Sequence, residues 1–135
     1  MNHATPHVMA CAKLSTRAIA FDVRASTTNA PEVDGIACDV VWTQGTIARD
    51  DGTTCWVEDD GVEVRARRKT GAVDVARHGA YACVRGRLVR ESGRWTIVDA
   101  VVVGCEDEGR RRTWRDETEE SRAARRAFLG ASAMA

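Results

Sequence analysis

Five short segments with the residue alternation of a β-strand follow one another between residues 39 and 103, and they restrict the fold more than any other feature of the sequence. The segments are 39–49, 53–58, 62–68, 80–90 and 94–103. In the third segment, apolar and charged residues alternate, as expected for a strand with one buried side and one side facing water. A turn pattern ending in glycine, Asp-Asp-Gly or Glu-Ser-Gly, joins successive strands at three of the four connections. The sequence therefore predicts an all-β domain.

The order of these segments indicates a particular barrel. Three strands joined by tight turns, a connector over 69–79 and then a hairpin are typical of a five-stranded OB fold. Gly45 interrupts the first strand and Gly86 the fourth, and glycine inside a strand lets it bend sharply at a barrel corner. We predict a single five-stranded OB-fold barrel with a short N-terminal helix and a C-terminal helix.

The length of 135 residues leaves room for one core and two flanking segments. We assign residues 38–105 to the barrel and residues 1–37 to a flexible N-terminal segment. Apolar residues within 12–23 predict a short helix that leans on the core, and polar and turn-forming residues over 26–35 predict a loop.

Residues 106–135 are predicted to hold a C-terminal helix and a tail. Thr113 followed by Asp116 fits a helix N-cap, and Gly130 fits a C-cap, so we expect a helix over 114–129. An exposed aromatic residue on a helix commonly anchors a protein interface. We predict that one face of this helix binds a partner, through Trp114, Thr118, Ser121, Arg125, Phe128 and the adjacent Leu129.

The charge balance weighs against strong, autonomous nucleic-acid binding. The 20 basic and 20 acidic residues cancel, whereas proteins that grip a phosphate backbone on their own usually carry a basic excess. The chain has no apolar run long enough for a membrane span, so we expect no membrane association.

The residues that could carry chemistry indicate no enzyme. The sequence lacks nucleophile-elbow, phosphate-loop and zinc-protease motifs, and turn chemistry accounts for its Asp-Asp pairs. The five cysteines are widely spaced without a Cys-x-x-Cys motif, which favours reduced cysteines in an intracellular protein. We predict no metal site, including at His3, His7 and Cys11, and no cofactor.

An alternative site would bind single-stranded nucleic acid across the second and third strands, as OB barrels commonly do. The candidates on these two strands are Arg65, Arg67 and Trp56, although the pattern leaves open which side of its strand Trp56 faces. A second candidate patch on the fourth strand consists of Tyr81, Arg85 and Arg87. Glu58 and Glu63 lie among the candidates of the second and third strands, and the aromatic content is only 5%, which makes a poor stacking platform.

Three motifs in register resemble RecQ-mediated genome instability protein 2. They are Val41-Trp42-Thr43-Gln44-Gly45-Thr46-Ile47, the acidic turn Glu58-Asp59-Asp60-Gly61 and Gly79-Ala80-Tyr81-Ala82-Cys83-Val84-Arg85-Gly86. Trp114 followed by Glu117 is similar to the start of that family's C-terminal helix, and the resemblance spans about residues 39–120. The arginine-rich helix, Arg85 and Arg87 depart from the family pattern.

The resemblance implies a non-catalytic OB-fold subunit in the nucleus. Such a subunit pairs with the OB domain of RecQ-mediated genome instability protein 1 and supports a RecQ helicase and topoisomerase III in dissolving double Holliday junctions. It implies a hetero-oligomer whose contact with DNA is weak or indirect. Two alternatives stay open: a single-strand-binding subunit resembling the middle subunit of replication protein A or a telomere-capping protein, and an RNA-binding OB module of translation.

Overall fold

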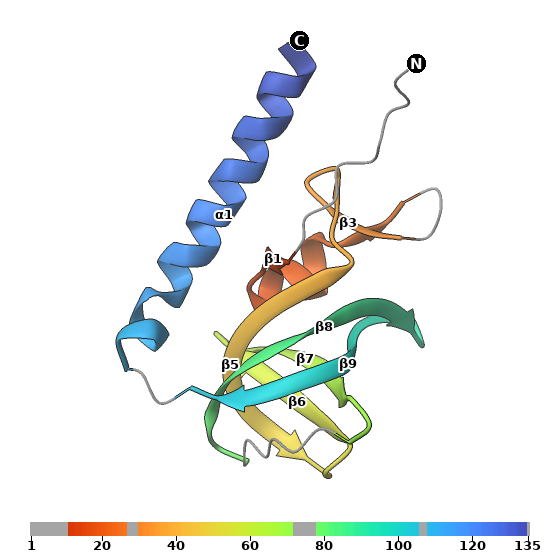
Figure 1. Cartoon of the computed structure of the whole chain (residues 1–135), viewed down its shortest axis with the longest axis vertical. Helices are drawn as coiled ribbons and strands as arrows, with labels where there is room; N and C mark the ends of the chain where they lie inside the picture. The colour runs from red at the N-terminus through yellow and green to blue at the C-terminus, as the bar shows by residue number, and fades with distance from the viewer. Residues whose placement is uncertain (1–10, 27–29, 72–77, 106–107, 135) are drawn as a thin grey trace.

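The computed structural model describes residues 11–26, 30–71, 78–105 and 108–134, with side chains described as far as residue 128. Five long strands form its central barrel (Figure 1). They are β5 (Val40–Asp50), β6 (Thr54–Asp59), β7 (Val62–Arg68), β8 (Tyr81–Glu91) and β9 (Arg94–Gly104). Each predicted strand boundary lies within one residue of the observed one.

Strand pairing closes the sheet. Strands β5, β6 and β7 form an antiparallel meander, and β8 and β9 form an antiparallel hairpin. The long strand β5 pairs with β8 through its first half and with β6 through its second half. The parallel pairing of β7 with β9 joins the meander to the hairpin and completes the barrel. The barrel is an OB fold.

Gly45 and Gly86 are the points where neighbouring strands come closest. A Cβ atom at Gly45 would lie 2.5 Å from the carbonyl oxygen of Glu58, and one at Gly86 would lie 2.6 Å from that of Val98. Gly45 stands just before Thr46, which pairs with both β6 and β8, and Gly86 sits at a register shift between β8 and β9. These two glycines permit the sharp strand curvature that closure requires, as the sequence predicted.

The core of the OB fold is built from the inward-facing residues of all five strands. Alternation along each strand buries these residues while their neighbours face outward. The buried set includes Val41, Ile47, Cys55, Val57, Val64, Ala66, Ala82, Val84, Leu88, Ile97, Ala100 and Val102.

The segment before the barrel contains short paired strands that the sequence did not predict. The helix predicted over 12–23 forms only over residues 16–22, with its π-helical part, η1, at Ala18–Asp22. Before it, β1 (Ala12–Lys13) pairs in parallel with β5. Instead of a loop over 26–35, a small sheet forms from β2 (Arg24–Ala25), β3 (Pro31–Val33) and β4 (Ile36–Ala37). The short helix is therefore present but covers fewer residues than predicted, and residues 27–29 of the predicted loop lie outside the described part of the chain. The loop prediction is wrong at Pro31–Val33, because the pairing of this segment with its neighbours is not encoded in local residue patterns.

The turn η1 covers one end of the barrel. It contacts β7 and β9, and Ile19 is fully buried there. The Trp95 Nε1 donates a hydrogen bond to the carbonyl oxygen of Val23 at 3.0 Å, and the Thr16 hydroxyl donates one to that of Asp59 at 3.1 Å. The N-terminal segment is thus anchored to the barrel, although Phe21, predicted to lean on the core, is 65% exposed.

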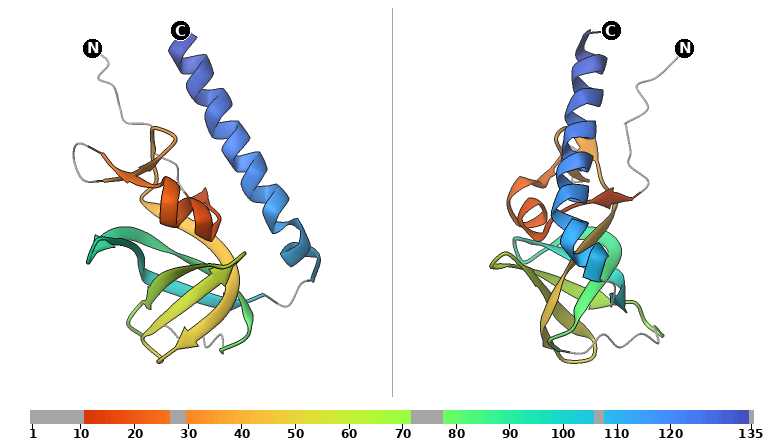
Figure 2. Two further views of the ribbon diagram at one scale, coloured as in Figure 1. Left: turned by 180° about the vertical axis from the view of Figure 1, so that it is seen from behind. Right: turned by 90° about the vertical axis from the view of Figure 1, so that its left-hand side faces the viewer.

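The C-terminal helix α1 (Glu108–Met134) is longer than predicted at both ends. Thr113 is not an N-cap, because its hydroxyl donates within the helix to the carbonyl oxygen of Arg110. Gly130 is not a C-cap, because the helix continues past it. The helix starts beside the barrel, passes the small sheet and extends beyond both (Figures 1 and 2). Within the described part of the chain, no helix is long and apolar enough to cross a membrane.

Candidate nucleic-acid and partner interfaces

The outer face of β6 and β7, called the groove face below, brings together three of the predicted nucleic-acid-binding residues. Inward-facing Cys55 and Val57 place Trp56 on the outer side of β6. Trp56 pairs across the strands with Arg65, and Arg67 lies two residues further along β7 on the same side. An aromatic ring and two guanidinium groups on this face are the components of a single-strand-binding surface.

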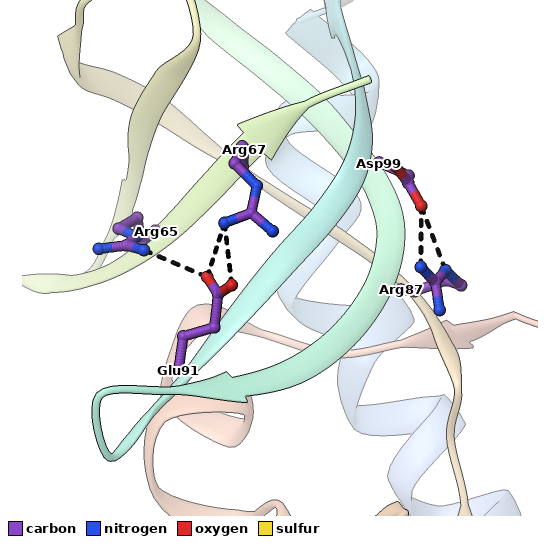
Figure 3. Close-up of polar contacts among 5 residues, drawn as sticks. All are labelled: Arg65, Arg67, Arg87, Glu91 and Asp99. Atoms are coloured by element: carbon purple, nitrogen blue, oxygen red, sulfur yellow. Dashed lines mark hydrogen bonds and ion pairs between the residues drawn. The ribbon is translucent and has the colours of Figure 1, made fainter. Parts of the chain in front are cut away.

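One carboxylate already forms hydrogen bonds with both β7 arginines, Arg65 and Arg67. Glu91, the last residue of β8, accepts a hydrogen bond from Arg65 at 3.1 Å and two from Arg67 at 3.0 and 2.9 Å (Figure 3). The hydrogen bonds from Arg67 hold the pKa of Glu91 below its usual range, so this carboxylate is ionised at neutral pH.

The ring of Trp56, on which a base would stack, is likewise in contact with another side chain of the protein. The guanidinium carbon of Arg49 lies 4.5 Å from the ring centroid of Trp56, a cation–π distance. Arg49 in turn forms an ion pair with Glu63 at 3.3 Å. On the groove face, each of the three arginines Arg49, Arg65 and Arg67 therefore has a carboxylate partner.

The three candidates on β8 are distributed differently. Tyr81 lies beneath α1: its hydroxyl donates to the Gln44 side-chain oxygen at 3.2 Å, and Arg111 of the helix covers its ring at 4.8 Å. Burial raises the pKa of Tyr81. Arg87 pairs with Asp99 at 2.9 Å (Figure 3), and Arg85 is exposed. The β8 candidates thus do not extend the groove face into one surface.

Two tryptophans form the joint between α1 and the barrel. The rings of Trp42 on β5 and Trp114 on α1 stack with centroids 6.3 Å apart, and Trp114 is 2% exposed. Arg110 of the helix lies over Trp42 at 4.5 Å. Lys13 of β1 approaches the same ring at 5.1 Å and pairs with Glu117 at 3.2 Å. Apolar stacking and charge together fix the first turns of α1 against β1 and β5.

A second joint fixes the middle of α1. Arg125 is 6% exposed and donates to Asp34 in the turn between β3 and β4 at 3.1 Å, and it also donates to Ser121 at 2.9 Å. Trp114, Thr118, Ser121 and Arg125 therefore lie wholly or partly covered on the side of α1 that faces the chain itself. Of the predicted partner face, Phe128 is 45% exposed, and the side chain of Leu129 is outside the described part of the helix.

A cleft of about 620 Å³ runs between α1, the N-terminal segment and the β6–β7 turn. Its acidic wall is the turn Glu58-Asp59-Asp60, where burial and then the two neighbouring carboxylates raise the pKa of Asp59. Arginines of α1, among them Arg111 and Arg115, line the opposite wall. Across the described ranges, no group of three or more His, Cys, Asp or Glu residues is placed to hold a metal ion.

Sequence reasoning placed Glu63 among the groove-face candidates but missed Glu91 and the tryptophan joint. Glu91 is identified in the sequence only as part of a turn, because its approach to β7 depends on the parallel pairing of β7 with β9. The contact of Trp42 with Trp114 joins residues 72 positions apart in the sequence. The signal in the sequence that could have indicated this contact is the presence of one tryptophan, Trp42, on a predicted strand and another, Trp114, on the predicted helix.

Comparison with known proteins identifies similar solved structures. No protein-family model matches the chain, and no curated protein matches it. Among solved structures, a chain of a replication protein A heterotrimer bound to ssDNA superposes with a TM-score of 0.72 at 17% identity. That match covers 87% of this chain and 98% of the other, which is more than the five barrel strands alone span.

Two further solved structures are similar. Telomere capping protein Ten1 from Saccharomyces pombe matches with a TM-score of 0.58 at 12% identity, over 84% of this chain and 99% of its own. A chain of the S. pombe Stn1–Ten1 complex matches with a TM-score of 0.57 at 12% identity, over 85% and 94%. At these identities, the comparisons show that the OB fold is shared.

Proposed function

We propose that this chain is a non-catalytic OB-fold subunit of a hetero-oligomeric complex that processes nucleic acid. The observation that carries the proposal is the match over 87% of the chain to a subunit of a heterotrimer bound to ssDNA. A second similar structure is also a complex of different chains, Stn1–Ten1. The absence of catalytic motifs in the sequence supports a role in assembly instead of catalysis.

The exposed side of α1 is the surface that we assign to the partner. Between Glu119 and Phe128, every described side chain except Ser121 and Arg125 is exposed. Ala123 and Ala127, and likewise Ala124 and Phe128, are four residues apart and form an apolar strip on this side. Small residues beside an aromatic one allow close approach of a second helix, so the strip supports docking by helix packing.

The resemblance to RecQ-mediated genome instability protein 2 suggests which complex this is. We propose an OB-fold partner like RecQ-mediated genome instability protein 1, with a RecQ helicase and topoisomerase III, acting on double Holliday junctions in the nucleus. The motif residues support this in one respect: Trp42 and Trp114, from opposite ends of the resemblance, stack on each other. The contact that positions α1 therefore accounts for both tryptophans of the resemblance.

The second candidate function is single-strand binding by the groove face, which the ssDNA in the replication protein A structure favours. Trp56, Arg65 and Arg67 would supply the contacts. Their carboxylate partners, together with zero net charge, argue that such binding is weak in the isolated chain.

Affinity purification of the tagged full-length chain, followed by mass spectrometry, tests the first candidate. We expect one OB-fold protein in stoichiometric amount, and a RecQ helicase and topoisomerase III in addition if the finer assignment holds. The double variant Ala124→Glu/Phe128→Glu should lose the partner, because it places charge on the apolar strip. The matched variant Arg122→Glu changes net charge by the same amount at an exposed position that is not three or four residues from any member of the strip, and it should retain the partner. A chain that elutes from cell extract as a monomer would exclude the proposal.

A further inference from the structure

Glu91 stands where a bound phosphate would be expected on the groove face. It ends β8 at the turn Ser92-Gly93, where both residues adopt positive φ angles of 52° and 76°. This tight turn pairs Glu91 with Arg94 and holds its position at the end of the β8–β9 hairpin. Because β9 runs parallel to β7, the hairpin carries Glu91 beside Arg65 and Arg67.

The contacts of Glu91 are those that an arginine pair would make to a phosphate. One carboxylate oxygen accepts from both arginines, and the second accepts from Arg67 (Figure 3). Guanidinium groups bind carboxylate and phosphate oxygens with the same forked geometry. The side chains are 28% exposed at Glu91, 37% at Arg65 and 43% at Arg67, so a ligand in solution can reach all three.

The charge of the groove face is balanced by this arrangement. Arg49, Arg65 and Arg67 face Glu58, Glu63 and Glu91, which gives no excess of either sign. Neutralised arginines release few counterions when a nucleic acid approaches, and counterion release supplies most of the affinity for a phosphate backbone. Removing one carboxylate gives this face a positive excess.

We propose that Glu91 sets the affinity of this OB fold for single-stranded nucleic acid, by occupying the two arginines that would otherwise bind its phosphates. This inference rests on the second candidate function. A single-stranded nucleic acid can bind the groove face only by displacing the Glu91 carboxylate from the two arginines. The isolated protein therefore binds nucleic acid weakly. Glu91 is thus an affinity-determining residue that faces the ligand's phosphate position.

Fluorescence anisotropy with the full chain and a labelled oligothymidylate of about 20 nucleotides tests the proposal, since OB folds cover about 4–16 nucleotides. We expect weak, salt-sensitive binding by the natural chain. Glu91→Gln should bind about three- to fivefold more tightly at low salt. Its logarithmic salt slope should steepen by about 0.7 to 1.4, the value for one or two additional phosphate contacts on a single strand.

Asp99→Asn is the matched control. Asp99 holds Arg87 in an exposed ion pair away from the groove face, and asparagine accepts its positive φ of 49°. The control changes net charge by the same amount as Glu91→Gln. Because the charge it removes lies away from the groove face, it should raise the affinity for the oligonucleotide by less. Adding Arg67→Gln to Glu91→Gln should return affinity to the natural level, with circular dichroism confirming that each variant is folded.

Three results would overturn the proposal: an unchanged affinity and salt slope in a folded Glu91→Gln chain, an equal gain in Asp99→Asn, or tight binding by the natural chain. None of these outcomes depends on partner capture. If the chain captures its partner but Glu91→Gln leaves the affinity unchanged, the proposed assembly role stands and the role of Glu91 is refuted. If Glu91→Gln raises the affinity but no partner is captured, only the assembly role is refuted.

Discussion

At the scale of single residues, the glycines at the two strand crossings decide whether the barrel can close. A side chain at Gly45 or Gly86 would meet the backbone of the neighbouring strand below 3.0 Å, and backbone cannot move aside cheaply. Gly104, also within a strand, has no other atom within 4 Å of its Cβ position. Comparing Gly→Ala at Gly45 or Gly86 with Gly→Ala at Gly104 therefore separates the effect of crowding from the general effect of replacing a strand glycine.

We predict that Gly45→Ala and Gly86→Ala each lower the free energy of unfolding by about 1–3 kcal/mol or more, the cost of overpacking. Gly104→Ala should change it by no more than about 0.5 kcal/mol. Urea denaturation followed by circular dichroism measures all three. Equal effects at Gly45 and Gly104 would show that strand crowding is not the cause.

The buried ion pair between Asp50 and Arg68 is the residue-scale source of a pH dependence. The two side chains lie 2.6 Å apart and are 11% and 8% exposed, so they join the end of β5 to the end of β7. The hydrogen bond from Arg68 lowers the pKa of Asp50. A lowered pKa in the folded chain means that the pair stabilises the fold above the unfolded pKa of about 3.9 and loses this effect as pH falls below it.

Asp50→Asn should accordingly cost about 1–3 kcal/mol of unfolding free energy at pH 7, in the range for hydrogen bonds to charged groups. The difference from the natural chain should shrink at an acidic pH below the unfolded pKa of about 3.9, because the natural chain then loses the contribution of the ionised Asp50 as well. Urea denaturation at both pH values measures it, and the exposed Glu120→Gln on α1 is the control. A difference that is constant with pH would contradict the assignment to Asp50.

At the scale of elements, α1 is held by two joints that differ in chemistry. The first is the Trp42–Trp114 stack, and the second is the Arg125–Asp34 ion pair 11 residues further along the helix. Trp114 buries a large apolar area, whereas helix propensity alone gives a solitary surface helix little stability. The stack is therefore the main attachment of the helix.

Trp114→Ala should cost about 3 kcal/mol, the lower part of the range for buried tryptophan, and Arg112→Ala, at an exposed position, about 0.5 kcal/mol or less. Hydrogen exchange should show faster exchange across 108–120 while the barrel amides keep their protection. Uniform loss of protection over barrel and helix would mean that α1 and the barrel unfold as one unit.

At the scale of the whole molecule, the N-terminal segment and the barrel share one core. Leu14, Ile19 and Val33 belong to the same buried cluster as the barrel residues. All five cysteines lie in described segments as free thiols, with Cys11 exposed and Cys38 and Cys55 fully buried. Burial raises the pKa of Cys38 to about 12 and that of Cys55 to about 11, which keeps both protonated.

Pulsed thiol labelling with mass spectrometry should therefore modify Cys11 first. Cys38, beside the small sheet, and Cys55, in the barrel, should react together and only at the rate of global unfolding, because one core encloses both. Added urea should speed both reactions in parallel. Labelling of Cys38 at the rate of Cys11, with Cys55 protected, would show that the N-terminal segment opens separately.

Local residue patterns predicted the strands, their order and the glycines that bend them. Alternation, turn residues and strand-interior glycine are local signals, so the five barrel strands were placed within one residue and the OB fold followed. They also indicated which side of β7 faces outward, and so named Arg65 and Arg67 as candidates.

The contacts of those outward residues depend on the tertiary structure. Glu91 reaches Arg67 across 24 positions of sequence, and Arg125 reaches Asp34 across 91. Such contacts depend on strand pairing and helix docking at long range, for which a residue's neighbours in sequence carry no signal. Local patterns thus predicted the five strands of the OB fold, whereas the ion pairs of the groove face and the exposed side of α1 depend on the tertiary fold.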